Sequence, residues 1–266
     1  KKTKIKNMRN PIILIASKKL LIAQMKVLKY KFKIVDVGLK NVNSGKINNK
    51  QINIINVNFK FKKAFDKISP KSNIYIEECS NTALKILNKT SSKVLINGPI
   101  SKKFFLKNKY PGMTEFFASK LGKKNKEVML IYNKKNSVSP VTTHFPLKKI
   151  FNKITTKKIV YNVQTIHNFY RKFLKETPRF AITGLNPHNE SFDKFNEEEK
   201  IIIPAIKKLK NNKININGPF PSDTIFLKNN LEKFDVVVGM YHDQVLAPIK
   251  SIYSFEAINI TLGLPF

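Results

Sequence analysis

Short runs of isoleucine and valine alternate along the chain with longer stretches in which apolar residues recur every three or four positions. The short runs are typical of buried strands and the longer stretches of amphipathic helices. The predicted strands cover residues 11–16, 32–37, 53–58, 93–97, 127–132, 138–142, 179–183 and 234–239. The predicted helices cover residues 17–29, 72–88, 113–121, 155–174, 196–210 and 242–250. This alternation predicts an α/β fold with a largely parallel sheet.

The best-defined helix is the one predicted over residues 196–210. Asn196 can cap its first turn, three glutamates follow at 197–199, and three lysines lie in its last turn. Acidic residues at the start and basic residues at the end complement the helix dipole. Pro204 lies inside this stretch and predicts a kink.

The chain carries a large positive charge, with 50 Lys and Arg against 17 Asp and Glu in 266 residues. A basic surface attracts nucleic acid, but Arg occurs only at Arg9, Arg171 and Arg179, and arginine is the residue that reads base edges best. The lysines are scattered and accompany many Asn and Ile residues, as composition drift in an AT-rich genome would produce. We therefore expect lysines spread over the surface, without a continuous arginine-bearing groove.

The sequence also limits compartment and topology. The single cysteine, Cys79, excludes an internal disulfide framework, which favours a reducing cytoplasm. No run of eighteen apolar residues occurs, so no membrane span is expected. The nine glycines form neither G-x-G-x-x-G nor G-x-x-x-x-G-K-[ST], so neither a Rossmann fingerprint nor a P-loop is present.

Three of the four histidines share a local context. His144, His188 and His242 each follow a predicted strand, and ligands of open α/β sheets bind beyond the carboxyl ends of strands. Three neutral imidazoles suit a catalytic divalent metal, and the neighbouring Asp243 is suited to orient a ring or complete the shell. A strand-end histidine is also commonly an ordinary loop residue. His167 lies in a predicted helix and is interpreted as structural.

Seven sequence blocks then occur in a fixed order. They are INGPISK (96–102), PGMTEFFA (111–118), TTHFPL (142–147), GLNPH (184–188), NGPFPSDTIF (217–226), MYHDQVLAPIK (240–250) and NITLGLPF (259–266). Together they resemble the 4-hydroxythreonine-4-phosphate dehydrogenase family over residues 94–266, and the first ninety residues resemble it more loosely.

The resemblance implies a fold similar to that of isocitrate and isopropylmalate dehydrogenases. Residues 1–266 would form a single catalytic unit of two interwoven α/β lobes, with N- and C-terminal segments of the family absent. The family is a homodimer with shared active sites, and it binds NAD or NADP without the Rossmann motif. Its divalent metal, zinc, magnesium or cobalt, would be held here by His144, His188 and His242.

The activity implied is NAD-dependent, metal-assisted oxidation of 4-phosphohydroxy-L-threonine to a 3-keto acid that decarboxylates, in pyridoxine and pyridoxal 5'-phosphate biosynthesis. The family's substrate-binding positions fall on Met113, Thr114, Lys250 and Asn259. The catalytic candidates are Asp223, Asp243 and Lys102, and the residues alone leave the proton acceptor open between the two aspartates.

One departure from the family keeps alternatives open. Met113 stands where the family usually has a substrate-binding histidine, and a thioether cannot replace an imidazole as a hydrogen-bonding group. A related dehydrogenase acting on another phosphorylated hydroxy acid, such as a four-carbon sugar-acid phosphate, is the nearest alternative. A basic nucleic-acid-binding protein and an inactive remnant with a structural role are the others.

Overall fold

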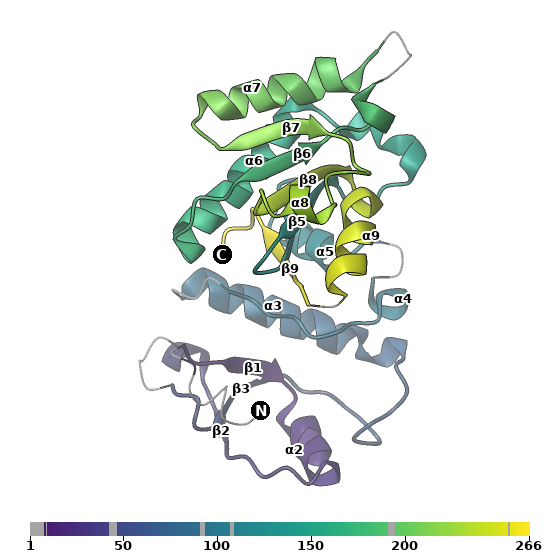
Figure 1. Cartoon of the computed structure of the whole chain (residues 1–266). Helices are drawn as coiled ribbons and strands as arrows, with labels where there is room; N and C mark the ends of the chain where they lie inside the picture. Colours follow the sequence, from purple (N-terminus) through teal and green to yellow (C-terminus); the bar gives the residue numbers. More distant parts are fainter. Residues whose placement is uncertain are drawn as a thin grey trace. The chain divides into compact units, whose positions relative to one another are not determined.

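The computed structural model describes residues 8, 10–42, 47–90, 94–106, 109–190, 195–254 and 256–266. The chain divides into two compact units (Figure 1). The first comprises Lys1–Tyr110 with Pro265–Phe266, and the second comprises Pro111–Leu264.

The first unit contains a small parallel sheet. Among the described residues its strands are β1 (Ile13–Ala16), β2 (Ile34–Asp36) and β3 (Ile52–Asn56), in the order β1-β3-β2. Its α-helices in the same part of the chain are α2 (Lys18–Val27), α3 (Asn73–Lys89) and the short α4 (Lys102–Phe105). Helix α2 starts where predicted because the Ser17 hydroxyl oxygen accepts a hydrogen bond from the Leu20 N–H at 3.3 Å.

The second unit is built on a larger mixed sheet. Its described strands are β4 (Val128–Tyr132), β5 (Ser137–Thr142), β6 (Phe180–Thr183), β7 (Ile216–Phe220), β8 (Val236–Tyr241) and β9 (Ile258–Leu262), in the order β7-β6-β8-β5-β4-β9. Strands β7, β6, β8 and β5 run parallel to one another, while β4 is antiparallel to both of its neighbours. The predicted α/β class with a largely parallel sheet is therefore confirmed.

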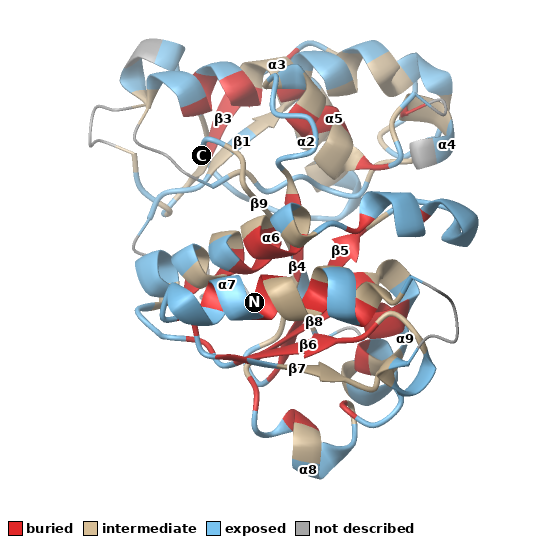
Figure 2. Cartoon of the chain, turned by 90° about the horizontal axis from the view of Figure 1, so that it is seen from above, coloured by how far each residue is buried: buried red, intermediate tan, exposed pale blue. Residues whose placement is uncertain are grey.

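Both faces of the central strands are buried, as Figure 2 shows for β5, β6 and β8. Alternate residues of β8 point to opposite sides: Val236 and Val238 join a core with α6 (Thr156–Phe169) and α7 (Ile203–Asn211), whereas Val237 joins a core with α9 (His242–Tyr253). A strand packed on both faces needs apolar residues at every position, which explains the continuous valine run that predicted it.

The helices of the second unit begin as their sequences suggest. The Asn196 side chain accepts a hydrogen bond from the Glu199 N–H at 3.2 Å, so the predicted cap is confirmed. The helix opens with a π-helical turn (Glu198–Ile202), and Pro204 follows in the first turn of α7, where a missing N–H is tolerated. None of the helices in the described part of the chain is both long and apolar enough to cross a membrane.

Some sequence-based predictions of elements are wrong. The strand predicted at 93–97 is not formed over its described residues 94–97, where Ile96 is 83% exposed and no neighbouring strand pairs with the segment. Strands β7 and β9 and the short helices α4 and α8 (Lys228–Leu231) were not predicted. Strand β7 contains a Gly-Pro pair that reads as a turn, and the short helices lack a full amphipathic period.

Candidate metal site at the carboxyl edge of the second sheet

Four neighbouring parallel strands direct polar residues to one edge of the sheet. His144 lies two residues after β5, His242 directly follows β8, and the loop after β6 leads to His188. Strand β7, next to β6, leads into the turn that carries Asp223. Because parallel strands end at the same edge, this is the position at which open α/β sheets bind ligands.

Two of the three histidines lie side by side. The ring centres of His144 and His242 are 5.7 Å apart, and their planes are inclined by 38°. Their side chains are 27% and 32% exposed, so both rings remain accessible from the edge. The Thr142 hydroxyl donates to the Met240 carbonyl oxygen at 2.6 Å and ties the ends of β5 and β8 together beside the pair.

A half-buried glutamate orients the His144 ring. Glu115, in the first turn of α5 (Met113–Lys120), has Oε1 2.9 Å from His144 Nδ1. Burial alone raises the pKa of the Glu115 carboxyl, but the hydrogen bond with His144, a backbone N–H, the charge of His144 and the Thr143 hydroxyl together outweigh burial, and the pKa falls below its usual range. Gly112 makes room for this contact, since a Cβ there would lie 2.9 Å from Glu115 Oε2.

An aspartate orients the second ring in the same way. Asp243 Oδ1 lies 2.7 Å from Nδ1 of His242. In both rings Nδ1 therefore faces a carboxylate, which leaves Nε2 as the nitrogen that can bind a metal. Metal-ligating histidines in proteins usually have this second partner, which fixes the tautomer and the direction of the ring.

The geometry of the pair fits a shared divalent cation. A metal about 2.0–2.1 Å from each Nε2 in tetrahedral geometry would place the two ring centres roughly 5 Å apart, close to the observed separation. In addition, the second oxygen of Glu115, Oε2, is buried without a hydrogen-bond partner in the described structure. A buried carboxylate oxygen beside two imidazoles increases the negative potential at which a cation would bind.

The described residues of one chain do not bring a third histidine, cysteine, aspartate or glutamate to this pair in a metal-binding arrangement. His188 itself is exposed and has left-handed backbone angles, with φ 56° and ψ 11°. The next residue, Asn189, is also left-handed, with φ 64°. Two consecutive non-glycine residues in this region are unusual and persist only where the surroundings hold them.

Those surroundings centre on Glu198, which is 1% exposed. Its Oε1 accepts the Leu185 N–H at 2.7 Å and the Asn186 N–H at 2.9 Å, and its Oε2 accepts the Asn186 side-chain amide at 2.9 Å. Burial on its own raises the pKa of the Glu198 carboxyl, but these hydrogen bonds outweigh burial and lower it.

This lowered pKa predicts a pH dependence of stability. A carboxyl whose pKa is depressed by folding stabilises the folded protein above its ordinary pKa of about 4.3, and this contribution is lost as the pH falls through the folded-state value. The difference in unfolding free energy between wild type and Glu198→Gln should therefore shrink as the pH is lowered from about 6 to 3. Urea unfolding at several pH values measures it, with exposed Glu199→Gln as control. A difference that stays constant with pH would contradict the assignment.

The substrate-binding positions predicted from the resemblance are distributed along the second unit. Met113 opens α5, and the Thr114 hydroxyl lies 2.8 Å from the Thr261 hydroxyl of β9. Lys250 follows His242 by eight residues on α9, which is about 12 Å along the helix. Asn259 of β9 pairs with Ile131 of β4, and Ile131 in turn pairs with Val138 of β5. Val138 lies four residues, or about 13 Å, before the end of β5 that leads to His144.

Lys250 and Asn259 thus lie away from the histidine pair within one chain, and both are exposed. Lys102 begins α4 in the first unit, and its side chain lies outside what the structure describes. Asp223 is exposed in the turn after β7.

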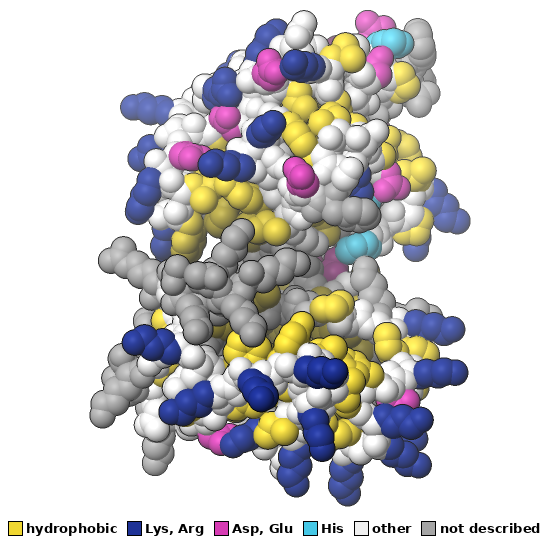
Figure 3. Space-filling view, turned by 60° about the horizontal axis from the view of Figure 1, so that its bottom comes forward, with side chains coloured by type: hydrophobic (Ala, Val, Ile, Leu, Met, Phe, Trp, Pro, Cys, Tyr) yellow, Lys and Arg dark blue, Asp and Glu magenta, His cyan; other side chains and the backbone are white. Residues whose placement is uncertain are grey.

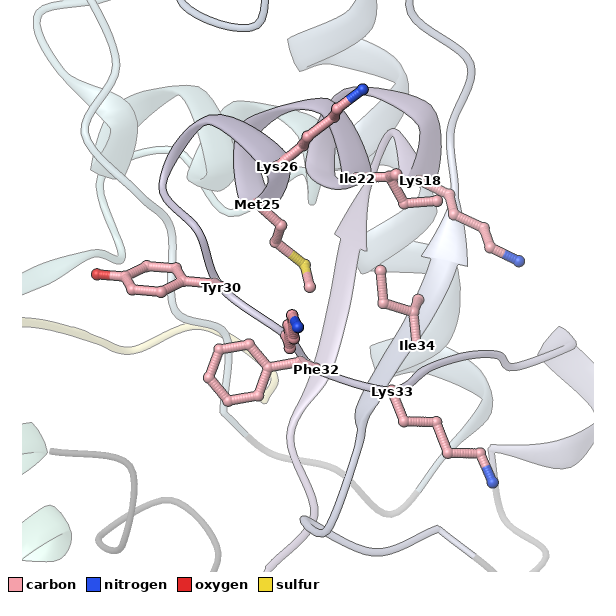
Figure 4. A pocket seen from close by; sticks show the side chains of 9 residues that line it. Lys18, Ile22, Met25, Lys26, Tyr30, Phe32, Lys33 and Ile34 are labelled. Carbon is pink, nitrogen blue, oxygen red and sulfur yellow. The ribbon is translucent and has the colours of Figure 1, made fainter.

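A surface groove occurs in the first unit between α2 and β2 (Figure 4). Lys18, Lys26, Lys31 and Lys33 surround an apolar floor that includes Ile22, Met25 and Ile34. None of the predicted site residues lines it, and Lys18 pairs with Asp36 rather than pointing free into the groove.

Comparison with known proteins identifies the family of the chain. A model of the family described as pyridoxal phosphate biosynthetic protein PdxA matches residues 7–266. The chain belongs to the PdxA family. The family predicted from the seven sequence blocks is therefore confirmed.

The PdxA relatives are similar over most of this chain. The 4-hydroxythreonine-4-phosphate dehydrogenase of Sulfurihydrogenibium sp. (strain YO3AOP1) is 38% identical over 219 residues, which are 81% of this chain and 66% of that protein. The enzyme of the same name from Bradyrhizobium diazoefficiens is 38% identical over 179 residues, which are 65% of this chain and 52% of that protein. The chain thus spans about half to two thirds of the length of these relatives.

The fold is also that of solved PdxA structures. The crystal structure of 4-hydroxythreonine-4-phosphate dehydrogenase from Klebsiella pneumoniae aligns with a TM-score of 0.78 at 23% identity, covering 100% of this chain and 84% of that chain. At 23% identity, this structural similarity shows the fold and not the function.

Sequence reasoning missed one residue of the site, Glu115. It stands inside the PGMTEFFA block, but a glutamate in a first helical turn is also expected for its favourable interaction with the helix dipole. The signal that could have found it is the neighbouring Gly112, since a buried glycine beside a charged side chain marks a close approach.

Proposed function

We propose that the chain acts in NAD-dependent, metal-assisted oxidation of 4-phosphohydroxy-L-threonine, with His144, His188 and His242 as metal ligands. The observation that carries the proposal is the pair of adjacent imidazoles whose Nδ1 atoms both face carboxylates. This arrangement leaves the Nε2 atom of each ring available to a metal, and a carboxylate behind each imidazole is typical of metal-ligating histidines. Membership of the PdxA family and the names of its curated relatives support the substrate.

A divalent cation held there would act as a Lewis acid on the hydroxyl that is oxidised. NAD would accept the hydride from the carbon that bears this hydroxyl. The product is a 3-keto acid whose carboxylate lies β to the ketone, so that loss of carbon dioxide follows readily.

The chain must supply a group that accepts the hydroxyl proton. Asp243 and Asp223 are the two candidates, and Asp243 is already hydrogen-bonded to His242. This favours Asp223, which is exposed in the turn after β7, the strand that neighbours β6. Lys102 and Lys250 would bind the anionic groups of the substrate, with Met113, Thr114 and Asn259 contributing the remaining contacts.

We further infer a homodimer in which the third ligand comes from the second copy. His188 is exposed and does not join the pair within the described part of one chain. A second copy related by a two-fold axis would present its own His188 to the pair, and the reverse contact would form at the other site. The same sharing accounts for Lys250 and Asn259, which lie away from the pair in their own chain. We place the reaction in the cytoplasm, in keeping with the single cysteine.

The charge distribution gives no support to nucleic-acid binding. On the face drawn in Figure 3, described lysine and arginine side chains are separated by apolar and neutral surface rather than joined in one track. Of the arginines that the structure describes, Arg179 is engaged by Asp235 at 2.9 Å. A groove for duplex recognition would need a continuous basic stripe.

The proposal is tested by measuring NADH formation with metal-loaded protein. 4-Phosphohydroxythreonine should be oxidised, a four-carbon sugar-acid phosphate should be oxidised less efficiently, and a chelator should stop both reactions. Asp223→Asn should lower kcat by about 10²–10⁴, the usual contribution of a general base, while metal binding stays intact. Exposed Asp66→Asn is the control and should leave kcat unchanged. Preference for the sugar-acid phosphate would instead favour the alternative substrate that Met113 suggests.

A further inference from the structure

One buried amide bridges the ends of the two strands that lead to His188 and His242. Gln244, the third residue of α9, is 7% exposed. Its Oε1 accepts the Met240 N–H at 2.7 Å and the Thr183 hydroxyl at 3.0 Å, and its Nε2 donates to the Gly184 carbonyl oxygen at 2.7 Å. All three hydrogen bonds are buried, so both the oxygen and the nitrogen of the amide are engaged between β6 and β8.

The backbone leaves space for this amide and for the Glu198 carboxylate. A Cβ on Gly239 would lie 3.0 Å from Gln244 Oε1 and 2.4 Å from a methyl of Val245. A Cβ on Gly184 would lie 3.0 Å from Glu198 Oε1. Both close approaches depend on glycine, at Gly239 inside β8 and at Gly184 directly after β6.

The side chains of Gln244 and Glu198 bind successive backbone groups of the His188 loop. Gln244 fixes its first residue, Gly184, to the helix that begins with His242, and Glu198 fixes the next two backbone N–H groups. The left-handed residues His188 and Asn189 follow within this loop. A backbone of that kind is maintained only where surrounding contacts determine it.

We propose that Gln244 is a positioning residue of the metal site, because its amide sets the His188 loop relative to the first turn of α9. This inference rests on the proposed function, since it takes His188 and His242 as metal ligands. Gln244 would not touch the metal or the substrate. It acts through the backbone on two ligands at once. In the dimer proposed above, each Gln244 would position His242 for the site of its own chain and His188 for the site of the partner chain.

The test compares Gln244→Met with a matched variant far from the edge. Methionine keeps the length of the side chain but leaves the Met240 N–H, the Thr183 hydroxyl and the Gly184 carbonyl without their partner. Asn136→Leu is the control: Asn136 is also a buried amide, bonded to Leu231, Phe234 and Tyr253, but it precedes β5 at the opposite end of that strand. Both variants remove buried hydrogen bonds from the same unit.

Two measurements separate positioning from general stability. In the metal-free protein, amide hydrogen exchange at 184–190 and 240–244 should rise about ten- to a hundredfold for Gln244→Met, the range expected for lost buried hydrogen bonds, and stay unchanged for Asn136→Leu. Affinity for Zn²⁺ or Co²⁺ should fall about 10–100-fold for Gln244→Met, as for other groups that orient metal ligands, and stay near wild type for Asn136→Leu. Thr183→Ser should retain affinity better than Thr183→Val.

The outcomes distinguish this inference from the proposed function. If wild type binds metal and Gln244→Met binds it as tightly, the metal centre stands and the positioning role is wrong. Unchanged exchange at 184–190 would equally overturn the positioning role. If wild type binds no divalent metal, the metal centre fails and the positioning role fails with it.

Discussion

Replacing either His144 or His242 by alanine is expected to weaken divalent-metal binding by more than about a hundredfold, because even losing a group behind a metal ligand typically costs 10–100-fold. The two rings lie 5.7 Å apart, and each is oriented by its own carboxylate, so neither can move to compensate for the other. Titration of the metal-free protein with Zn²⁺ measures the affinity.

His167→Ala is the matched control for this loss. His167 lies on α6, and burial lowers its pKa, as expected for a structural imidazole inside a helix. The variant should therefore bind metal like wild type. If His167→Ala lost metal as completely as His144→Ala, the effect would come from folding rather than from coordination. Retention of wild-type affinity by His242→Ala would show that the two adjacent histidines do not bind the metal together.

The second large effect concerns sharing of ligands between two copies. His144→Ala and His188→Ala should each fail to bind metal alone, yet their mixed dimer should contain one site with all three histidines. Random pairing makes about half of the dimers mixed, so co-expression should restore about a quarter of the wild-type metal content and NADH formation. Co-expression with two different affinity tags isolates the mixed dimer for measurement.

The combinations of variants that regain metal binding show which histidines come from the same chain. His242→Ala should also be rescued by His188→Ala, because the adjacent pair comes from one chain and the third ligand from the other. A mixture of His144→Ala and His242→Ala should remain without metal, since every site then lacks one ring. Rescue in that last mixture, or none in the first two, would show that the ligands are divided in another way.

The sequence predicted the framework of the site because its strands are buried on both faces. Runs such as Val236–Val238 have no polar residue to interrupt them, and this predicts a central strand without any alignment. The three histidines follow these strands within five residues, so their position at the carboxyl edge followed from the fold class. The cap of the helix after the His188 loop involves residues only three apart in the sequence, and the sequence therefore predicted it correctly at Asn196.

The rest depended on contacts between distant parts of the chain. Glu115 meets His144 across 29 residues, and Gln244 meets Gly184 across 60. No period or spacing reveals such pairs, because they depend on which strands are neighbours in the sheet. The strand predicted at 93–97 was wrong for a related reason: an apolar run predicts a strand only where another strand can pair with it.

The most direct measurement is an anomalous diffraction map from crystals grown with Zn²⁺. We expect one strong peak per chain, about 2.0–2.1 Å from Nε2 of His144 and of His242, with His188 of the partner subunit as the third protein ligand. Glu115 and Asp243 should remain on the Nδ1 atoms behind the two rings. A peak held by other residues, or no peak beside this pair in crystals that contain Zn²⁺, would contradict a metal site at His144, His242 and His188.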